Sequence, residues 1–247
     1  MLTEQRHEII LQLLNERGSV TVNELKLLLK SSESTIRRDL NTLDEEGKLT
    51  KVFGGAVLKD QDFSTVELSV TQKSSVNAVE KQKIAQYAAS LIQPDDFVYI
   101  DAGTTTEYMI DFLTEKGATY VTNAVTHARK LALAGFKVIQ IGGELKGITE
   151  AVVGNQAILT LEKMNFNKGF FGTNGISRHR GFTTPDFNEA MVKETAFGHS
   201  HDRYVLADSS KFDEISSVTF GQFEDAVVIT DEKAVGTYGK CANVTVI

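Results

Sequence analysis

Residues 32–40 read Ser-Glu-Ser-Thr-Ile-Arg-Arg-Asp-Leu, and this stretch decides how the first part of the chain folds. Its first serine is a preferred helix N-cap, so a helix is predicted to begin after it and to end at Gly47. Ile36, Leu40 and Leu43 recur at i, i+4 and i+7, which gives that helix one buried face. The opposite face then presents polar side chains to solvent, namely Ser34, Thr35, Arg38 and Asn41.

Two further helices precede this one, and a hairpin follows it. Apolar residues at helical spacing predict a first helix over residues 3–17, with Gly18 as its stop. Thr21-Val22-Asn23-Glu24 has the capping-box form that predicts a second, short helix. Gly54-Gly55 lies between two strand-like runs, residues 49–53 and 56–58, which is a two-residue hairpin signal. This order of elements is typical of a winged helix-turn-helix.

The chemistry of the exposed helix and the hairpin fits double-stranded DNA. Hydroxyl and amide side chains near the start of a recognition helix read base edges, arginines contact guanine or phosphate, and a wing reaches the flanking backbone. Charge alone does not indicate DNA, because residues 1–58 carry eight Lys or Arg against nine Asp or Glu in a chain of net charge −7. The ordered pattern favours DNA over a merely solvated arginine pair. The residues predicted to contact DNA are Ser34, Thr35, Arg37, Arg38, Asn41, Lys51, Gly54 and Gly55.

The composition is that of an ordinary globular protein. The 247 residues are 41% hydrophobic and 24% charged, without an apolar run long enough to cross a bilayer. The single cysteine, Cys241, excludes an intrachain disulfide and a zinc site built from several thiolates. We therefore expect a cytoplasmic protein without a cofactor, a metal or a membrane partner. Residues 1–58 are predicted to form a DNA-binding domain, residues 59–74 a linker and residues 75–247 a second domain.

From residue 76 onward, helical and strand patterns alternate. Helices are predicted over residues 79–92, 108–115, 125–134, 156–164 and 188–197, and strands over residues 97–100, 119–122, 137–141, 168–171, 204–207 and 226–229. Such alternation predicts an α/β domain with a largely parallel, Rossmann-like sheet covered by helices. In such sheets, ligands bind where loops leave the carboxyl ends of the strands.

Small and hydroxyl-bearing residues gather at those predicted strand ends. Asp101-Ala102-Gly103-Thr104-Thr105-Thr106 follows one strand and opens a helix, so its amides and hydroxyls can cradle a phosphate. Taken singly, each such turn is equally consistent with an ordinary capped turn, and Lys211 with a solvated cation. Their recurrence at successive strand ends favours a site for a polyhydroxylated anion. The residues predicted to bind this effector are Asp101, Gly103, Thr104, Thr105, Thr106, Asn123, Gly143, Glu144, Lys146, Asn174 and Lys211.

Motifs in both predicted domains resemble one known family. The chain resembles the DNA-binding signature of the DeoR family of bacterial sugar-responsive repressors in three places. They are Arg6, Ile10 and Leu14, residues 32–40, and Val52-Phe53-Gly54-Gly55-Ala56. Members of that family often have His where Phe53 stands. The family's effector domain is similar to residues 101–105, 142–144, 149–154, 174–176, 181–186 and 208–212, which adds Asp186 to the predicted effector-binding residues.

The resemblance implies a fold and a function. The family's effector domain is similar in fold to ribose-5-phosphate isomerase and binds phosphorylated sugars. We therefore expect a repressor, a homo-oligomer (dimer or tetramer) that places paired winged helices on operator DNA and is released by its effector. Within the family the sequence most resembles fructose-operon repressors of low-GC Gram-positive bacteria, which implies fructose 1-phosphate. Phosphates of the tagatose and galactitol pathways stay open as alternatives, because spacing and composition do not separate them.

The alternative from another class is a sugar-phosphate isomerase with an accessory domain. Isomerisation through an enediol needs a general base and an electrophile for the developing oxyanion. Where the isomerase carries Asp-Gly-Ala-Asp-Glu, this chain has Phe171-Gly172-Thr173-Asn174-Gly175, so both aspartates are missing, although Glu189 stands about where a catalytic Glu is expected. His199 and His201 lack matching carboxylates for a metal site. A sensor without catalytic residues is therefore the prediction.

Overall fold

The computed structural model of the protein describes residues 2–57, 69–234 and 238–247. The chain divides into two compact units, Met1–Asp62 and Phe63–Ile247. Each unit has its own hydrophobic core. Among the described helices, none is long and apolar enough to span a bilayer.

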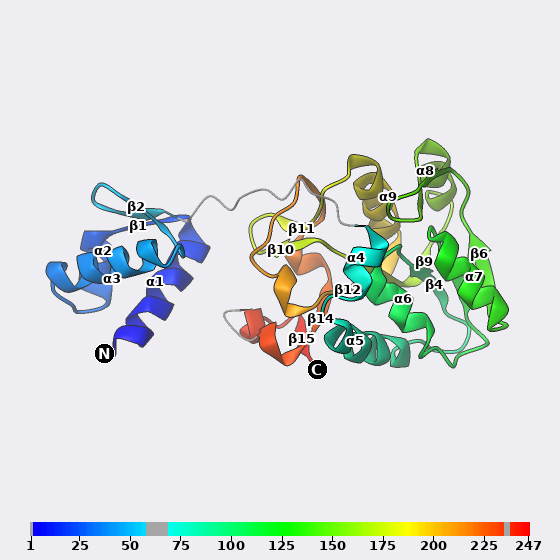
Figure 1. Ribbon diagram of the computed structural model, residues 1–247, viewed down its shortest axis with the longest axis horizontal. Coiled ribbons are helices and arrows are strands. Elements are labelled where there is room, and N and C mark those ends of the chain that lie inside the picture. Colours follow the sequence, from blue (N-terminus) through cyan, green and yellow to red (C-terminus); the bar gives the residue numbers. More distant parts are fainter. Residues whose placement is uncertain (1, 58–68, 235–237) are drawn as a thin grey trace. The chain divides into compact units, whose positions relative to one another are not determined.

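The first unit packs three helices against a small antiparallel sheet (Figure 1). Its elements are α1 (Thr3–Arg17), β1 (Ser19–Thr21), α2 (Val22–Leu28), α3 (Glu33–Glu45), β2 (Thr50–Val52) and β3 (Gly55–Val57), with the strands in the order β1-β3-β2. The apolar face of α3 is buried among side chains of α1 and α2. The side chains of Thr21 and Ser32 cap α2 and α3 by accepting hydrogen bonds from the amides of Glu24 and Thr35. The predicted winged helix-turn-helix is confirmed.

The wing differs from the prediction by one residue. Phe53 and Gly54 form its turn, with Val52 opposite Gly55, whereas the sequence predicted Gly54-Gly55 as the turn. Gly54 has the positive φ, +86°, that favours glycine in such a turn. Gly55 lies within β3, where an added Cβ would come within 2.1 Å of the Val20 carbonyl oxygen, so this glycine allows β3 to approach β1. The sequence did not reveal β1, because three residues carry too little alternation to mark a strand.

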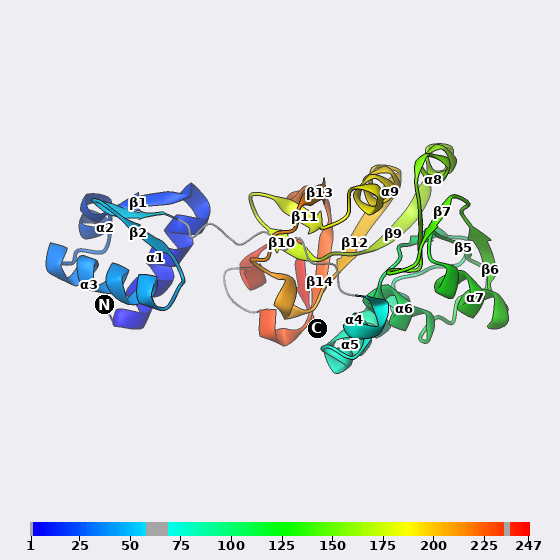
Figure 2. The same cartoon turned by 45° about the horizontal axis from the view of Figure 1, so that its top comes forward.

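The second unit is built on a seven-stranded parallel sheet (Figures 1 and 2). The strands stand in the order β15-β14-β12-β9-β4-β5-β6, and every neighbouring pair is parallel. Their bounds are β4 (Phe97–Ile100), β5 (Thr119–Thr122), β6 (Lys137–Gln140), β9 (Phe166–Gly172), β12 (Ser200–Leu206), β14 (Val227–Thr230) and β15 (Val244–Val246). The predicted parallel α/β sheet is confirmed, with β15 as an additional strand.

Helices cover both faces of this sheet (Figure 2). One face is covered by α5 (Ala78–Ser90), α6 (Thr104–Ile110) and α7 (Val125–Leu133), and the other by α8 (Asn155–Leu161) and α9 (Phe187–Gly198). The prediction placed the start of α6 at residue 108, but the helix begins at Thr104, because the threonine-rich turn itself forms the first helical turn. That turn is therefore held rigidly against the end of β4.

The chain order of the strands reverses at the centre of the sheet. From β4 the chain moves outward through β5 and β6, and then returns to place β9, β12, β14 and β15 on the other side of β4. In open α/β sheets, a crevice forms at such a switch point, outside the carboxyl ends of the strands, and binds ligands. The fold therefore directs attention to the ends of β4 and β9.

Smaller elements that the sequence did not predict lie beyond the main sheet. They are the hairpin of β7 (Glu144–Lys146) and β8 (Ala151–Val153), the sheet of β10 (Gly175–Ser177), β11 (Gly181–Thr184) and β13 (Val218–Gly221), and the helix α4 (Val70–Ser74). Residues 59–74 were predicted as a linker, whereas residues 70–74 form α4 and contact α6. The rest of that predicted linker, up to residue 68, lies outside the described residues.

Candidate functional site

The outward face of α3 carries the side chains predicted to read DNA. Exposed or half-buried on this face are Ser34, Thr35, Arg37, Arg38 and Asn41. Arg37 forms an exposed ion pair with Glu33 one turn earlier, with 2.8 Å between Nη2 and Oε1. The side chain of Arg38 has no hydrogen bond or ion pair with a described residue. It does not cap α3 either, because Ser32 provides the N-cap of that helix. Arg38 is therefore the arginine of this face with its donors available to DNA.

A buried ion pair fixes α3 against α1. The Nε and Nη2 atoms of Arg6 donate to the two carboxylate oxygens of Asp39 over 2.8 and 3.0 Å. Both side chains are almost fully buried, and the hydrogen bonds to Asp39 raise the pKa of Arg6. These two residues of the family-like motif therefore orient the recognition helix.

The wing is tied to the same face of α3 through Lys51. The main-chain amide of Lys51 donates to Asp44 Oδ1 at 3.0 Å, and its Nζ donates to Asn41 Oδ1 at 2.6 Å. Lys51 and Gly54 are exposed, whereas Gly55 is buried. Gly55 was predicted to contact DNA, and its burial instead gives it a role in packing the wing.

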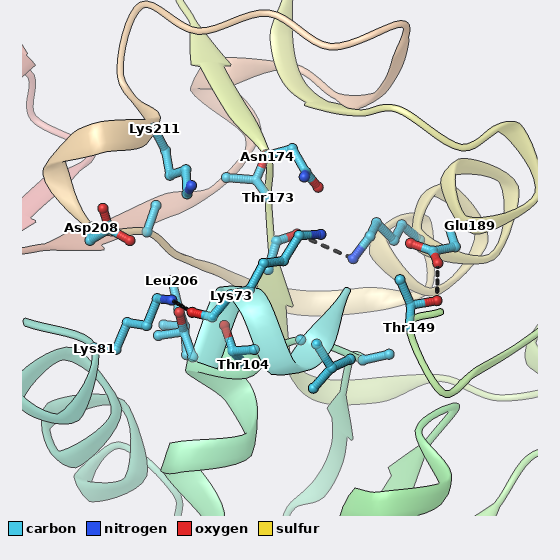
Figure 3. A pocket seen from close by; sticks show the side chains of 17 residues that line it. Lys73, Lys81, Thr104, Thr149, Thr173, Asn174, Glu189, Leu206, Asp208 and Lys211 are labelled. Carbon is cyan, nitrogen blue, oxygen red and sulfur yellow. Dashed lines mark hydrogen bonds between the residues drawn. The ribbon is translucent and has the colours of Figure 1, made fainter. Parts of the chain in front are cut away.

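The second unit holds a pocket at the carboxyl ends of β4, β9 and β12 (Figure 3). It encloses about 700 Å³ of space, which includes its open solvent mouth. Side chains from α4, α5 and α9 line it together with the β4–α6 turn and the segments that follow β9 and β12. The predicted effector-binding residues in its lining are Gly103, Thr104, Thr105, Asn174 and Lys211.

Three lysines converge on this pocket from different elements. Lys81 of α5 is buried, and its Nζ donates to the main-chain oxygen of Lys73 at 2.5 Å. Burial lowers the pKa of Lys81, and the positive charges of Lys211 and Lys73 lower it further. The negative charge of Asp208 acts in the opposite direction. The side chain of Lys211 points into the pocket and has no hydrogen bond or ion pair with a described residue (Figure 3). Crowded positive charge of this kind favours the binding of an anion.

Asp208 stands beside those lysines as an ionised neighbour. Its Oδ1 accepts hydrogen bonds from Asn77 Nδ2 at 2.8 Å and from Ser210 Oγ at 2.5 Å. Burial alone would raise the pKa of Asp208, but the hydrogen bonds from Ser210 and Asn77 and the charge of Lys211 outweigh burial and lower it. The pocket lining as a whole still holds four lysines against two carboxylates.

Lys193 is the fourth lysine, and it has a buried counter-ion. Its Nζ donates to Asp101 Oδ2 and, at 3.2 Å, to the main-chain oxygen of Gly172. Burial raises the pKa of Asp101, and the charge of Lys193 opposes this shift. Asp101 was predicted to bind the effector, but it does not line the pocket and instead fixes Lys193.

Thr149 and Glu189 face the lysine cluster from the opposite side of the pocket (Figure 3). Thr149 Oγ1 donates to Glu189 Oε1, and Lys146 Nζ lies 3.3 Å from the same oxygen and 3.0 Å from Asp186 Oδ2. Asp186 also caps α9 by accepting from the Glu189 amide at 2.8 Å. Lys146 and Asp186 were predicted as effector ligands, and the structure places them behind Glu189, outside the pocket lining.

The other predicted residues also lie outside the lining. Thr106 is buried, and its hydroxyl donates to main-chain oxygens of the β4–α6 turn. Asn123 is buried and accepts from an amide of the same turn at 2.9 Å. Glu144 opens β7 and Gly143 directly precedes it, where an added Cβ on the glycine would lie 2.5 Å from a carbonyl oxygen of β8. These residues shape the loops that carry the pocket.

Sequence reasoning missed Lys73, Lys81 and Lys193. Lys73 lies in a stretch that lacks long apolar periodicity, and lysines on helices usually mark a solvated face. A signal was present nonetheless, because Lys81 lies three residues before Ile84 and shares the buried face of α5. Within the part of the chain that the structure describes, no group of three or more His, Cys, Asp or Glu side chains is placed to hold a metal ion.

Comparisons with known proteins match both units. Residues 6–62 match the DeoR-like helix-turn-helix domain, and residues 76–232 match the DeoR C terminal sensor domain. The chain belongs to the DeoR family. The second match covers more than half of the chain and includes the whole pocket apart from α4, so the unit that holds the pocket is the family's sensor domain.

Full-length relatives of this DeoR-family protein are transcriptional regulators. The HTH-type transcriptional regulator FruR of Bacillus subtilis is 42% identical over 248 residues, covering 100% of this chain and 98% of that protein. The lactose phosphotransferase system repressor of Streptococcus mutans is 35% identical over 94% of this chain and 93% of that protein. The predicted family and the prediction of a repressor instead of an enzyme are confirmed.

Solved structures resemble the chain more distantly. Ribose 5-phosphate isomerase A from Methanocaldococcus jannaschii has a TM-score of 0.41 at 13% identity and covers 55% of each chain. The probable sor operon regulator from Shigella flexneri has a TM-score of 0.41 at 8% identity and covers 67% of this chain and 90% of that chain. Likeness at this level carries no argument about ligand or activity.

Proposed function

We propose that this repressor controls an operon for the utilisation of a sugar, fructose. We further propose that a phosphorylated sugar, fructose 1-phosphate, releases the repressor from its operator. The names of its relatives support a sugar regulon, since one is FruR and others are lactose phosphotransferase system repressors. The proposal includes operator DNA as partner, a dimer or tetramer that occupies two half-sites, and a cytoplasmic location.

The observation that carries the proposal is the charge of the sensor pocket. The lining of the pocket holds four lysines against two carboxylates, and the charges of Lys211 and Lys73 lower the pKa of Lys81. A phosphate dianion would relieve that repulsion through charge-assisted hydrogen bonds. The main chain of Gly103 and the hydroxyl of Thr104 stand at the same pocket and offer further donors.

The rest of the pocket suits a sugar. Glu189 and Asn174 offer oxygen acceptors, and Thr149 and Thr173 carry hydroxyls, in the same lining. A ketose or polyol supplies several hydroxyl groups that pair with such groups. Fructose without phosphate should bind poorly, because the lysines would then lack an anion.

Release from DNA follows from differential binding. The sugar phosphate must bind more tightly to the arrangement of the protein that holds DNA weakly, and DNA must in turn weaken sugar-phosphate binding by the same factor. Glu189 accepts a hydrogen bond from Thr149 and pairs with Lys146. These interactions and the family assignment favour binding of the ligand without its chemical conversion.

A thermal-shift titration of the full chain tests the proposal. Fructose 1-phosphate should raise the melting temperature, with a stabilisation of about 2.7 kcal/mol at a ligand concentration of 100 times Kd, whereas fructose and inorganic phosphate should give smaller shifts. Tagatose and galactitol phosphates serve as matched arms for the alternative effectors. No shift with any sugar phosphate would refute a sugar-phosphate sensor, and a larger shift with tagatose or galactitol phosphate would replace fructose 1-phosphate as the effector.

A further inference from the structure

The helix α4 is the described element that follows residues 58–68 in sequence, and it forms part of the pocket. Its residues Val70 and Lys73 both belong to the pocket lining. The first unit of the chain ends within the stretch that precedes α4, so any signal that travels along the chain from the pocket to that unit passes through this helix. Figure 3 shows Lys73 extending into the middle of the pocket.

Hydrogen bonds to its main chain hold α4 in place. The amide of Val70 donates to the Ile148 carbonyl at 3.3 Å, in the loop between β7 and β8. Lys81 Nζ of α5 donates to the carbonyl of Lys73 at 2.5 Å, and the hydroxyl of Tyr108 of α6 donates to the carbonyl of Ser74 at 3.1 Å. These hydrogen bonds come from three different elements, so α4 stays docked only while all three keep their places.

Apolar packing contributes little to this docking. None of the α4 residues whose burial is described is fully buried, and none belongs to the buried residues of either core of this unit. A segment with few buried apolar contacts has a low free energy of local opening. A ligand that contacts α4 can therefore stabilise its docked state.

An anion in the pocket would hold α4 directly. Lys73 belongs to α4, whereas Lys81 belongs to α5 and Lys211 follows β12. A phosphate that contacts Lys73 and one of the other two lysines bridges α4 to the body of the sensor domain. The same anion would offset the positive charges of Lys73 and Lys211, which lower the pKa of Lys81.

We propose that α4 transmits the binding of an anion in the pocket to the DNA-binding unit. An anion held by Lys73 fixes α4, and this helix follows the residues that connect the two units in sequence. This inference rests on the proposed sugar-phosphate effector. It assigns different roles to two pocket lysines: Lys211 contributes to affinity alone, whereas Lys73 contributes to affinity and to transmission.

The test compares Lys73→Met with Lys211→Met, which remove the same charge from the same pocket. Operator duplex selected from a random pool with the full-length parent is titrated with each protein, with and without fructose 1-phosphate, at ligand concentrations where calorimetry shows full occupancy. In the parent, saturating ligand should lower operator affinity by about 5- to 150-fold, the usual range of allosteric coupling. Lys211→Met should need more ligand but reach the same plateau, whereas the plateau of Lys73→Met should fall toward no change.

A second variant and a second measurement keep the proposal falsifiable if Lys73→Met folds poorly. Tyr108→Phe removes one hydrogen bond to α4 outside the pocket lining and should raise the ligand concentration needed for release by about 2- to 12-fold, the equivalent of one neutral hydrogen bond. Hydrogen exchange of the full chain should show that fructose 1-phosphate protects the amides of α4, with α8 as the unaffected control.

The outcomes separate this inference from the proposed function. Equal plateaus for Lys73→Met and Lys211→Met, or unchanged exchange at α4 in the ligand-bound parent, would overturn the role of α4 while leaving the sensor intact. Failure of the parent to bind any sugar phosphate would instead overturn the proposed effector, and the role of α4 with it.

Discussion

Replacing Lys211 by Met should weaken binding of the sugar phosphate without disturbing the fold. The side chain is half-buried, points into the pocket and has no hydrogen bond or ion pair with a described residue. Its charge helps to lower the pKa of Asp208, but that carboxylate keeps its hydrogen bonds from Asn77 and Ser210 when the charge is removed. Methionine keeps most of the aliphatic length and removes only the charge. The melting temperature of the ligand-free protein should therefore stay within about 2 °C of the parent, because surface substitutions usually change stability by no more than about 0.5 kcal/mol.

The expected loss of affinity follows from the partial exposure of Lys211. A hydrogen bond to a charged group contributes about 1.5–3 kcal/mol when it is well shielded, and solvent screening places Lys211 at the lower end of that range. About 1.5–2 kcal/mol corresponds to a 10- to 30-fold rise in Kd. Higher salt should narrow the gap between variant and parent, because the lost interaction is electrostatic.

Isothermal titration calorimetry of the full chain with fructose 1-phosphate measures this loss. Lys137→Met is the matched control, because Lys137 is an exposed lysine at the amino end of β6, the end of the sheet opposite the pocket. The control should bind like the parent. A Lys211→Met protein that binds within twofold of the parent would show that the phosphate sits elsewhere in the pocket.

Four further substitutions test other parts of the structure. Arg38→Ala should cost about 1–3 kcal/mol of operator binding in a gel-shift titration without lowering the melting temperature. Ile36→Ala should instead destabilise the first unit by about 2–5 kcal/mol. Unchanged operator affinity of the Arg38 variant would refute the assignment of Arg38 as a DNA contact. Arg6→Ala should destabilise the same unit by up to about 3–5 kcal/mol in urea unfolding, because it leaves the buried carboxylate of Asp39 with one described side-chain partner, His7 at 3.3 Å, and a loss below 1 kcal/mol would contradict that reasoning. Burial lowers the pKa of His127 from 6.5 to about 3. Between those pH values the unfolded chain binds one more proton than the folded chain, so the stability of the sensor domain should fall by up to about 1.4 kcal/mol per pH unit on acidification. His127→Gln should lessen this slope, and an unchanged slope would assign the acid sensitivity to other groups.

Local signals were sufficient for the first unit. The spacing of Ile36, Leu40 and Leu43 and the caps at Thr21 and Ser32 predicted helices whose bounds the structure confirms to within a few residues. Helix stripes and caps are read from neighbouring residues, so tertiary context adds little to them. The turn of the wing lies one residue before its predicted position, because either of two adjacent glycines fits the hairpin signal. Only the pairing of β3 with β1 selects Gly54 as the turn residue.

The sensor pocket was predicted only in part, because its residues meet through the topology of the sheet. The turn at Gly103 and the ends of β9 and β12 were found, since ligand sites follow parallel strands. Lys81 and Lys193 were missed because burial of a lysine on a helix depends on what packs over it. The helix α4 had one readable signal, the capping box of Ser69 and Gln72, but five residues carry no apolar period.

Asp101, Lys146 and Asp186 show the limit of inferring a role from a motif. All three stand close to the pocket, yet each neutralises or orients a neighbour, and none belongs to the lining. Sequence patterns place such residues near a site because the whole constellation is needed to build it. Whether a side chain faces the ligand or supports a residue that does is decided by packing.

The measurement that tests the account most directly is release of the full-length protein from selected operator duplex by a sugar phosphate. A fluorescence-anisotropy titration compares fructose 1-phosphate, fructose and inorganic phosphate at equal ionic strength, with NMR of the recovered ligand to check that it is chemically unchanged. The account predicts that fructose 1-phosphate lowers operator affinity by about 5- to 150-fold, that the other two compounds do not, and that the ligand is recovered intact. Operator affinity that does not respond to any sugar phosphate, or conversion of the ligand at an ordinary catalytic rate, would contradict it.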